Sequence, residues 1–174
     1  MKALTTSLMI AAALTLGACS IPDRFGAGSG TGLGVDGFGG AGAIVPGSVN
    51  DPTSAAYFQA NVGDRVLFPV DQSALTDVAR NTLEGQAQWL LANTDYTVII
   101  EGHADEQGTR EYNLGLGARR ANSVQEYLVD RGVSPARIRV VSFGKERPIE
   151  LCSVEACYAQ NRRAVTVVST GLGS

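Results

Sequence analysis

The sequence contains few of the His and Cys ligands that metal sites require and lacks the excess of basic residues that nucleic-acid binding requires. Its 174 residues include one histidine, His103, and three cysteines. Zinc sites usually draw on several His or Cys ligands, so we expect neither a metal nor another cofactor. An alternative metal or catalytic site would have to combine this histidine with Glu101, Asp105 and Glu106, although strand residues of opposite parity face apart. The net charge of −3 lacks the basic excess that affinity for nucleic acid requires.

The N-terminus lacks an apolar stretch long enough to span a membrane. Leu8 to Leu16 follows Lys2 and is too short to cross about 30 Å of hydrocarbon as a helix. A short apolar region that ends in small residues is typical of an export signal that is removed from the mature protein. We therefore interpret residues 1–18 as a signal peptide.

The end of this signal resembles a bacterial lipobox. Leu16-Gly17-Ala18-Cys19 has Leu three positions before a cysteine and two small residues between them, so Cys19 is the expected lipidation site. The alternative is an ordinary signal peptide with a chance cysteine. Several acyl chains anchor a protein stably where one does not. Because Ser20 follows the cysteine, where Asp would favour the inner membrane, we expect a lipid anchor in the cell outer membrane, with the protein facing the periplasm.

A Gly-rich, nearly uncharged segment follows the anchor. It has too few apolar side chains to offset the entropy of ordering, so we interpret residues 19–60 as the lipidated cysteine and a flexible tether. A compact domain is expected over residues 61–170, with Asp64 at the start of its first strand pattern, and residues 171–174 form a tail.

Strand and helix patterns alternate through the compact domain. Short apolar runs predict strands at 65–68, 97–102, 138–143 and 163–169. Helical spacing predicts two helices. The first has apolar positions Leu75, Val78, Ala79, Leu83, Ala87, Leu90 and Leu91, and the second has small or apolar positions Leu114, Gly117, Ala121, Val124 and Leu128.

The order of these elements predicts the fold class. The pattern β-α-β-α-β-β indicates an α+β fold, a two-layer sandwich whose mixed four-stranded sheet carries two main helices on one face. Gly117 and Ala121 indicate that the second helix approaches the sheet closely, and Arg131-Gly132 has the glycine expected just past a helix end.

Motifs with consistent spacing run through the segment from Arg65 to Val168. They are Glu101-Gly102-His103-Ala104-Asp105-Glu106 with Gly108-Thr109, then Asn113, Leu116, Arg120-Ala121, Val124 and Leu128 in the pattern Asn-x2-Leu-x3-Arg-Ala-x2-Val-x3-Leu, then Val140 to Glu146 with Pro148, and Gln160 to Val165. Together they resemble the OmpA-like peptidoglycan-binding domain family, and within it the lipoproteins of the Tol system.

The resemblance implies a binding role and not an enzymatic one. Members of the family bind the diaminopimelate residue of the peptidoglycan stem peptide, whose free end carries an ammonium and a carboxylate on one carbon. By match to the family motif, Asp105 would accept from the ammonium and Arg120 would clamp the carboxylate through two donors. Leu116, one helical turn before Arg120, would form a wall of the pocket, and Asp71 is a further acceptor. Without the resemblance, an Asp–Arg pair is more often a surface ion pair.

The resemblance also implies partners. A Tol lipoprotein would link the outer membrane to peptidoglycan, bind a TolB-type periplasmic propeller, and act in envelope integrity and cell division. One alternative is an OmpA-like wall-anchoring lipoprotein outside the Tol system. Another is a peptidoglycan-cleaving enzyme, which would need an acid–base pair or a metal with a positioned nucleophile.

Three further expectations concern residues near the predicted site. Cys152 and Cys157 are expected to form a disulfide, because exported proteins meet an oxidising compartment; two free thiols are the alternative. Arg162 and Arg163, in the family's Asn-Arg-Arg motif, are expected to cap local backbone near the pocket. His103 is expected to make a hydrogen bond at the pocket rim.

Overall fold

The computed structural model describes residues 44–171. The predicted signal peptide at 1–18, Cys19, the tether as far as residue 43 and the last three residues of the tail lie outside the described part. No helix between residues 44 and 171 is long and apolar enough to cross a membrane.

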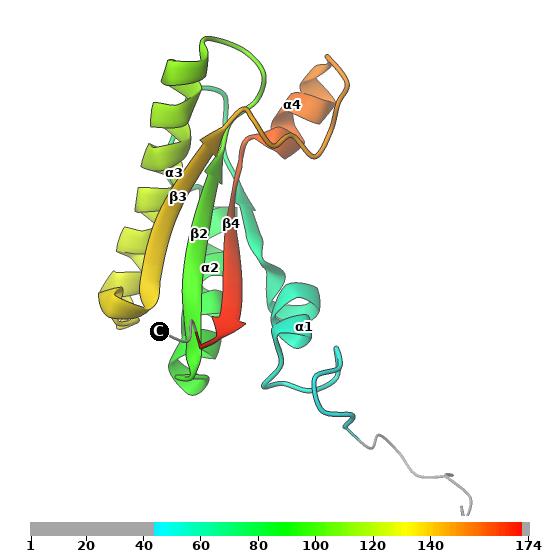
Figure 1. Cartoon of the computed structure of the whole chain (residues 1–174), viewed down its shortest axis with the longest axis vertical. Coiled ribbons are helices and arrows are strands. Elements are labelled where there is room, and N and C mark those ends of the chain that lie inside the picture. Colours follow the sequence, from blue (N-terminus) through cyan, green and yellow to red (C-terminus); the bar gives the residue numbers. More distant parts are fainter. Residues whose placement is uncertain (1–43, 172–174) are drawn as a thin grey trace, which may run out of the picture. The chain divides into compact units, whose positions relative to one another are not determined.

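The described chain folds into one mixed sheet with helices. The strands are β1 (Arg65–Leu67), β2 (Tyr96–His103), β3 (Ile138–Gly144) and β4 (Arg163–Thr170), in the order β1-β4-β2-β3. β4 pairs antiparallel with β1 and β2, whereas β2 and β3 are parallel. The longest helices, α2 (Asp77–Ala92) and α3 (Arg110–Asp130), cover one face of the sheet (Figure 1). The predicted α+β fold is therefore confirmed.

A threonine hydroxyl caps the N-terminus of each of the two main helices. The Thr76 hydroxyl accepts from the backbone N–H of Ala79 at the start of α2, and the Thr109 hydroxyl accepts from that of Tyr112 at the start of α3. Both are N-caps, which satisfy a backbone donor that the helix itself leaves unpaired. After α3, Gly132 adopts a φ of +99°, as expected for a glycine just past a helix end.

The prediction for the helix before β2 is wrong at three positions. α2 begins at Asp77, so Leu75 precedes the helix, and Val78 and Leu91 are exposed instead of lying on the buried stripe. The buried stripe runs through Ala79, Leu83, Ala87 and Leu90 and includes Trp89 and the polar Gln86. Gln86 belongs to it because its carboxamide accepts from the Thr166 hydroxyl at 2.7 Å and donates to the Gly63 carbonyl at 2.7 Å.

Two glycines allow α3 to lie directly on the sheet, as predicted for Gly117. A Cβ placed on Gly102 of β2 would lie 1.8 Å from the Gly117 carbonyl oxygen, and a Cβ on Gly117 would lie 2.5 Å from the Ser142 hydroxyl oxygen. No side chain fits at either position. This contact sets the position of the first turns of α3 above the end of β2.

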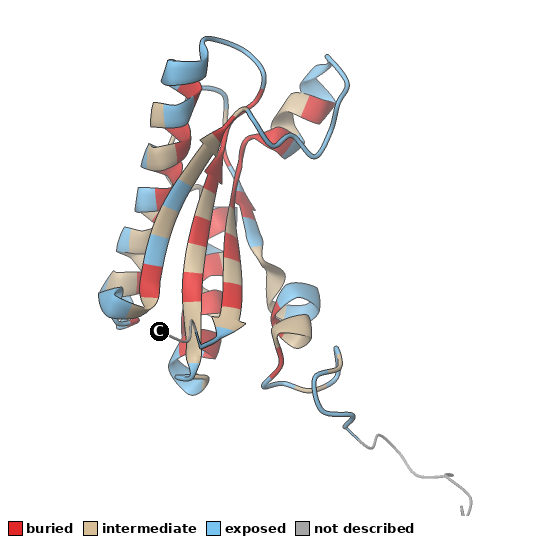
Figure 2. Cartoon of the chain, in the orientation of Figure 1, coloured by how far each residue is buried: buried red, intermediate tan, exposed pale blue. Residues whose placement is uncertain are grey.

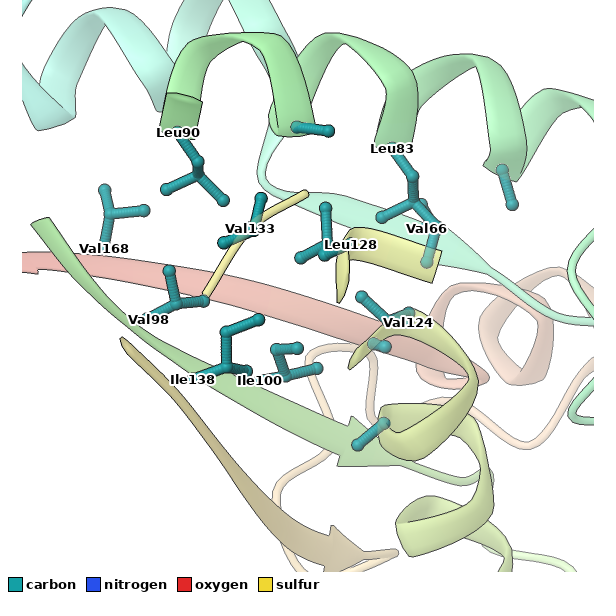
Figure 3. Packing of buried hydrophobic residues seen from close by; sticks show 14 of the residues in the cluster. Val66, Leu83, Leu90, Val98, Ile100, Val124, Leu128, Val133, Ile138 and Val168 are labelled. Atoms are coloured by element: carbon teal, nitrogen blue, oxygen red, sulfur yellow. The ribbon is translucent and has the colours of Figure 1, made fainter. Parts of the chain in front are cut away.

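The core lies between the sheet and the two helices. Val98 and Ile100 of β2 face Leu83 and Leu90 of α2 and Val124 and Leu128 of α3 (Figure 3). Burial alternates along the central strands, because one side of each strand faces the helices (Figure 2).

Apolar packing begins before residue 61, the predicted start of the compact domain, and so includes the end of the segment predicted to be a flexible tether. A short helix, α1 (Ala55–Tyr57), continues into a π-helical segment at Phe58–Gly63, and Phe58 is fully buried. Its ring lies 4.9 Å from that of Trp89, whose indole N–H donates to the Pro52 carbonyl at 2.7 Å. The segment before β1 therefore belongs to the packed structure.

The connection between β3 and β4 contains a helix that the sequence pattern did not indicate. This helix, α4 (Glu155–Asn161), is seven residues long and lies at the end of the sheet where β2 leads into α3 (Figure 1). Cys152 and Cys157, expected to pair, form a disulfide across its start, with Cα atoms 5.8 Å apart.

Candidate functional site

A polar pocket of about 230 Å3 lies at the end of β2. Three segments line it: the loop after β1, the loop after β2, and the first three turns of α3. The lining residues are Val70, Asp71, Asp105, Gln107, Gly108, Tyr112, Asn113, Leu116 and Arg120. The four residues predicted for ligand binding, Asp71, Asp105, Leu116 and Arg120, therefore come together here from positions up to 49 apart in the sequence.

Arg120 is the only fully buried charged side chain among the lining residues, with 0% of its surface exposed. Its Nε donates to the Gln72 carbonyl at 2.8 Å and its Nη1 to the His103 carbonyl at 2.8 Å. Its Nη2 donates to the Pro69 carbonyl at 3.2 Å. A guanidinium has five N–H groups, so one on each terminal nitrogen makes no hydrogen bond within residues 44–171.

The charge on Arg120 survives burial. Desolvation lowers the pKa of Arg120 to about 10, and the neighbouring Asp105 carboxylate opposes that shift. A group with a pKa near 10 is protonated at neutral pH. The guanidinium also lies over the Phe68 ring, at 5.2 Å from the ring centre, so the cation is fixed on one side by an aromatic face and at its rim by three carbonyls.

Asp105 is also buried, with 7% of its surface exposed, and both of its carboxylate oxygens have partners. Oδ1 accepts from the backbone N–H of Gln107 at 3.2 Å, and Oδ2 lies 3.1 Å from Nη1 of Arg162. This ion pair was not foreseen from the sequence. The expectation for Arg162 extended only to backbone capping near the pocket, and the capping is present, since Nε donates to the Phe68 carbonyl at 3.3 Å.

Arg162 joins the pocket to α4. Its Nη2 donates to the carboxylate of Glu155, the first residue of that helix. Burial alone would lower the pKa of the Arg162 guanidinium, but hydrogen bonds and charge from Glu155 and Asp105 outweigh it, and the pKa is raised. The side chain therefore lies as a cation between two anions.

Asp71 occupies the pocket mouth with an unusual backbone. It is the one non-glycine residue between 44 and 171 with a positive φ, 56°, a conformation that Asp and Asn tolerate better than most residues. Its carboxylate accepts from the Tyr112 hydroxyl. That hydrogen bond raises the pKa of Tyr112 and connects the loop after β1 to α3 across the mouth.

The position predicted for His103 is wrong. The residue is 1% exposed and does not line the pocket, and neither ring nitrogen has a hydrogen-bond partner in the described structure. Its ring stacks on Phe143 with centres 5.5 Å apart. Burial, followed by the charges of Arg163 and Arg147, lowers the pKa of His103 to about 4. His103 contributes to the site through its backbone, because its carbonyl accepts from Arg120.

Several lining residues were not singled out in advance. The Asn113 carboxamide donates to the Gln107 carbonyl at 2.7 Å, which holds the loop after β2 on α3. Gly108 in that loop has a φ of +91°, a conformation that favours glycine. Gly108 and Asn113 belong to the motifs that carry the family resemblance, so their signal was present without a specific role attached.

The arrangement offers a cation and two anions around one small cavity. Within residues 44–171, no group of three or more His, Cys, Asp and Glu residues is arranged to hold a metal. The charges that line the cavity are those of Arg120, Asp105 and Asp71, with Leu116 as an apolar wall. Such a set is complementary to a compact group that carries both an ammonium and a carboxylate.

Comparison with known proteins gives one family. The model of the OmpA family matches residues 67–162, a range that includes every residue lining the pocket. A protein of Rhizobium meliloti named peptidoglycan-associated lipoprotein is 53% identical over 135 residues, which cover 78% of this chain and 73% of that protein.

Solved structures show similarity over the same part of the chain. The crystal structure of the peptidoglycan-associated lipoprotein from Burkholderia pseudomallei matches with a TM-score of 0.62 and 39% identity, covering 70% of this chain and 98% of that one. The C-terminal domain of Helicobacter pylori MotB has a TM-score of 0.58 at 22% identity, over 63% of this chain and 86% of that one. The second likeness concerns the fold alone.

Proposed function

The chain belongs to the OmpA family and groups with the peptidoglycan-associated lipoproteins, and from this membership we propose that its pocket binds the free end of a diaminopimelate residue in peptidoglycan. That end is a zwitterion, with an ammonium and a carboxylate on one carbon. Non-covalent binding of such an end would hold the protein on the cell wall.

One observation carries the proposal: a buried guanidinium with unused donors shares a small pocket with two carboxylates. Nη1 and Nη2 of Arg120 each keep one N–H group without an acceptor in the described structure, and a guanidinium with a donor on each terminal nitrogen can bind a carboxylate in bidentate fashion. Asp105 and Asp71 supply acceptors for the ammonium. Because Arg120 and Asp105 are held by protein contacts before any ligand arrives, little ordering entropy is lost on binding.

We propose that the rest of the chain anchors this domain to the outer membrane. Lipidation at Cys19, followed by the Gly-rich tether, would place the domain in the periplasm within reach of the wall. Support comes from the lipobox-like Leu16-Gly17-Ala18-Cys19 and from relatives named as lipoproteins. The protein would then link the outer membrane to peptidoglycan non-covalently.

The partnership with a TolB-type propeller, and with it a role in envelope integrity and cell division, is part of the same proposal. It rests on the resemblance to the Tol lipoproteins. The wall and the propeller would compete for overlapping surfaces around the pocket. We expect the propeller to co-purify with this chain and to be released by excess peptidoglycan fragments. A wall-anchoring lipoprotein outside the Tol system would retain no propeller.

Binding is favoured over cleavage because the acidic groups near the pocket are already engaged. Asp105 pairs with Arg162, and the Glu106 carboxylate accepts from the hydroxyls of Ser153 and Tyr158, both at 2.9 Å. A general acid must be able to exchange its proton with the substrate. We therefore expect no release of soluble fragments when the protein is incubated with purified sacculi.

Sedimentation with purified sacculi tests the proposed function. The wild-type domain should pellet with the wall, and Asp105→Ala should remain in the supernatant. Asp130→Ala is the matched control, because Asp130 is an exposed aspartate at the last position of α3 and does not line the pocket. Equal sedimentation of the wild type and Asp105→Ala would contradict the proposal.

A further inference from the structure

The segment between β3 and β4 holds both acidic residues of the loop after β2. Asp105 is held through Arg162, and Glu106 is held directly by Ser153 and Tyr158. The disulfide between Cys152 and Cys157 closes this segment around the start of α4. Asp105, one of the two anions of the pocket, is therefore positioned by a part of the chain that does not itself line the pocket.

Three charged groups form a row that leads away from the pocket. The Asp105 carboxylate lies at the pocket, the Arg162 guanidinium behind it, and the Glu155 carboxylate behind that. The first two side chains of the row are buried and the last faces solvent: those of Asp105 and Arg162 are 10% and 6% exposed, and that of Glu155 is 67% exposed. Nη1 of Arg162 donates to Asp105 at 3.1 Å and also to Glu155 at 3.5 Å, and Nη2 donates to Glu155, so the two carboxylates share one cation.

The sharing of Arg162 between two carboxylates affects how strongly Asp105 attracts the ammonium group of a ligand. Without Glu155, the charges of Asp71, Asp105, Arg120 and Arg162 would cancel, and Arg162 could turn both terminal nitrogens toward Asp105. An anion that is fully neutralised by a guanidinium attracts an ammonium weakly. With Glu155 in place, Arg162 is divided between two carboxylates, and the charged groups around the pocket carry a net negative charge.

We propose that Glu155 is a positioning residue that determines ligand specificity: by holding Arg162, it keeps Asp105 able to bind an ammonium group. This inference rests on the proposed function, since it concerns the ammonium of the same diaminopimelate end. Glu155 therefore sets the preference for ligands that bear the amine and has little influence on the carboxylate, which meets Arg120 on the other side of the pocket.

Three matched stem-peptide fragments test the inference by isothermal titration calorimetry. One carries meso-diaminopimelate, one carries L-lysine at that position and so lacks the carboxylate, and one carries 2-aminopimelate and so lacks the amine. Glu155→Gln keeps a hydrogen-bond acceptor for Arg162 but removes the charge. Affinity for the two amine-bearing peptides should fall about three- to tenfold, whereas affinity for the 2-aminopimelate peptide should not fall.

Two further variants separate positioning from simple stability or net charge. Glu155→Asp keeps the charge and should restore most of the preference for the amine. Glu150→Gln removes a carboxylate from the same exposed segment, at a residue whose side chain makes no hydrogen bond or ion pair with Arg162 in the described structure, and should bind all three peptides as the wild type does.

The outcomes distinguish this inference from the function on which it rests. If Glu155→Gln lowered the affinity for all three peptides equally, Glu155 would have only a structural role and the inference would be overturned. Unchanged affinity for all three peptides would overturn it as well. Wild-type protein that fails to bind the diaminopimelate peptide would overturn the proposed function and the inference together.

Discussion

Asp105 and Arg120 line the same pocket, yet no ion pair joins them within the described structure, because each is held by other groups. Asp105 pairs with Arg162 at 3.1 Å, and Arg120 donates to three backbone carbonyls. A direct pair would have joined the two side chains to each other instead of to a ligand. Held apart, they present a separate anion and cation to a ligand that carries both charges.

Arg120 is predicted to have a structural role in addition to binding. Arg120→Ala would leave three buried carbonyls without their donor, and we expect the free energy of unfolding to fall by about 3–5 kcal/mol. Arg120→Lys keeps the charge but not the planar fork, so it should lose less stability and still bind ligand poorly. Urea denaturation measures the first effect, and Arg119→Ala should remain within about 0.5 kcal/mol of the wild type.

The contact between Gly102 and Gly117 should be among the least tolerant in the fold. Gly102→Ala would place a methyl group 1.8 Å from a backbone oxygen of α3, and we expect a loss of about 3 kcal/mol or more as the helix is pushed off the sheet. Gly85→Ala in α2 is the control, because its nearest neighbour would lie at an ordinary 3.6 Å. Thermal unfolding should show Gly85→Ala to be neutral or slightly stabilised; a mild effect of Gly102→Ala would contradict the close approach.

His103 is predicted to make the fold sensitive to acid. Its pKa in the folded protein is about 4, below the usual 6.5, chiefly because of burial. Between these pH values the unfolded chain binds the proton and the folded chain does not. Protonation of this histidine therefore costs no free energy of unfolding above about pH 6.5, and the free energy of unfolding falls as the pH drops toward 4. The loss reaches up to about 3 kcal/mol, although Glu101 lies 3.6 Å away and would favour the protonated ring.

A pH series of urea denaturation curves measures this contribution. The wild type and His103→Phe should both lose stability in acid as carboxylates titrate, but the loss between pH 7 and pH 4.5 should be smaller in the variant. Phenylalanine preserves a ring that can stack on Phe143. Parallel pH profiles for the two proteins would be inconsistent with a buried, neutral histidine.

The sheet and the two main charged residues of the site could be predicted from the sequence. The strands follow from local patterns of apolar residues, and the site residues follow from motifs with fixed spacing. The strand around Ile100 is a continuous apolar run, and Gly117 falls at a helical position where only a small residue allows close packing. Asp105 and Arg120 were placed by the spacing of the family motif. Their proximity across the pocket therefore follows from a strand, a short loop and a capped helix in sequence.

Other features depend on contacts between distant segments that no local pattern reveals. α4 has seven residues, about two turns, too few for a helical repeat of apolar positions to be distinguished. Phe58 precedes the first strand pattern, and its burial depends on packing against Trp89. Val78 fits the helical spacing but lies at the exposed start of α2. The pairing of Arg162 with Asp105 joins residues 57 positions apart, and the resemblance indicated only that they are near.

The central claim is that Asp105 binds the ammonium of diaminopimelate, and a double-mutant cycle across the complex tests it most directly. Calorimetry would compare wild type and Asp105→Asn, each with the meso-diaminopimelate peptide and with the 2-aminopimelate peptide that lacks the amine. If the two groups contact each other, removing both should cost little more affinity than removing either one. Losses that simply add, or an Asp105→Asn variant that binds the diaminopimelate peptide as tightly as the wild type, would contradict the claim.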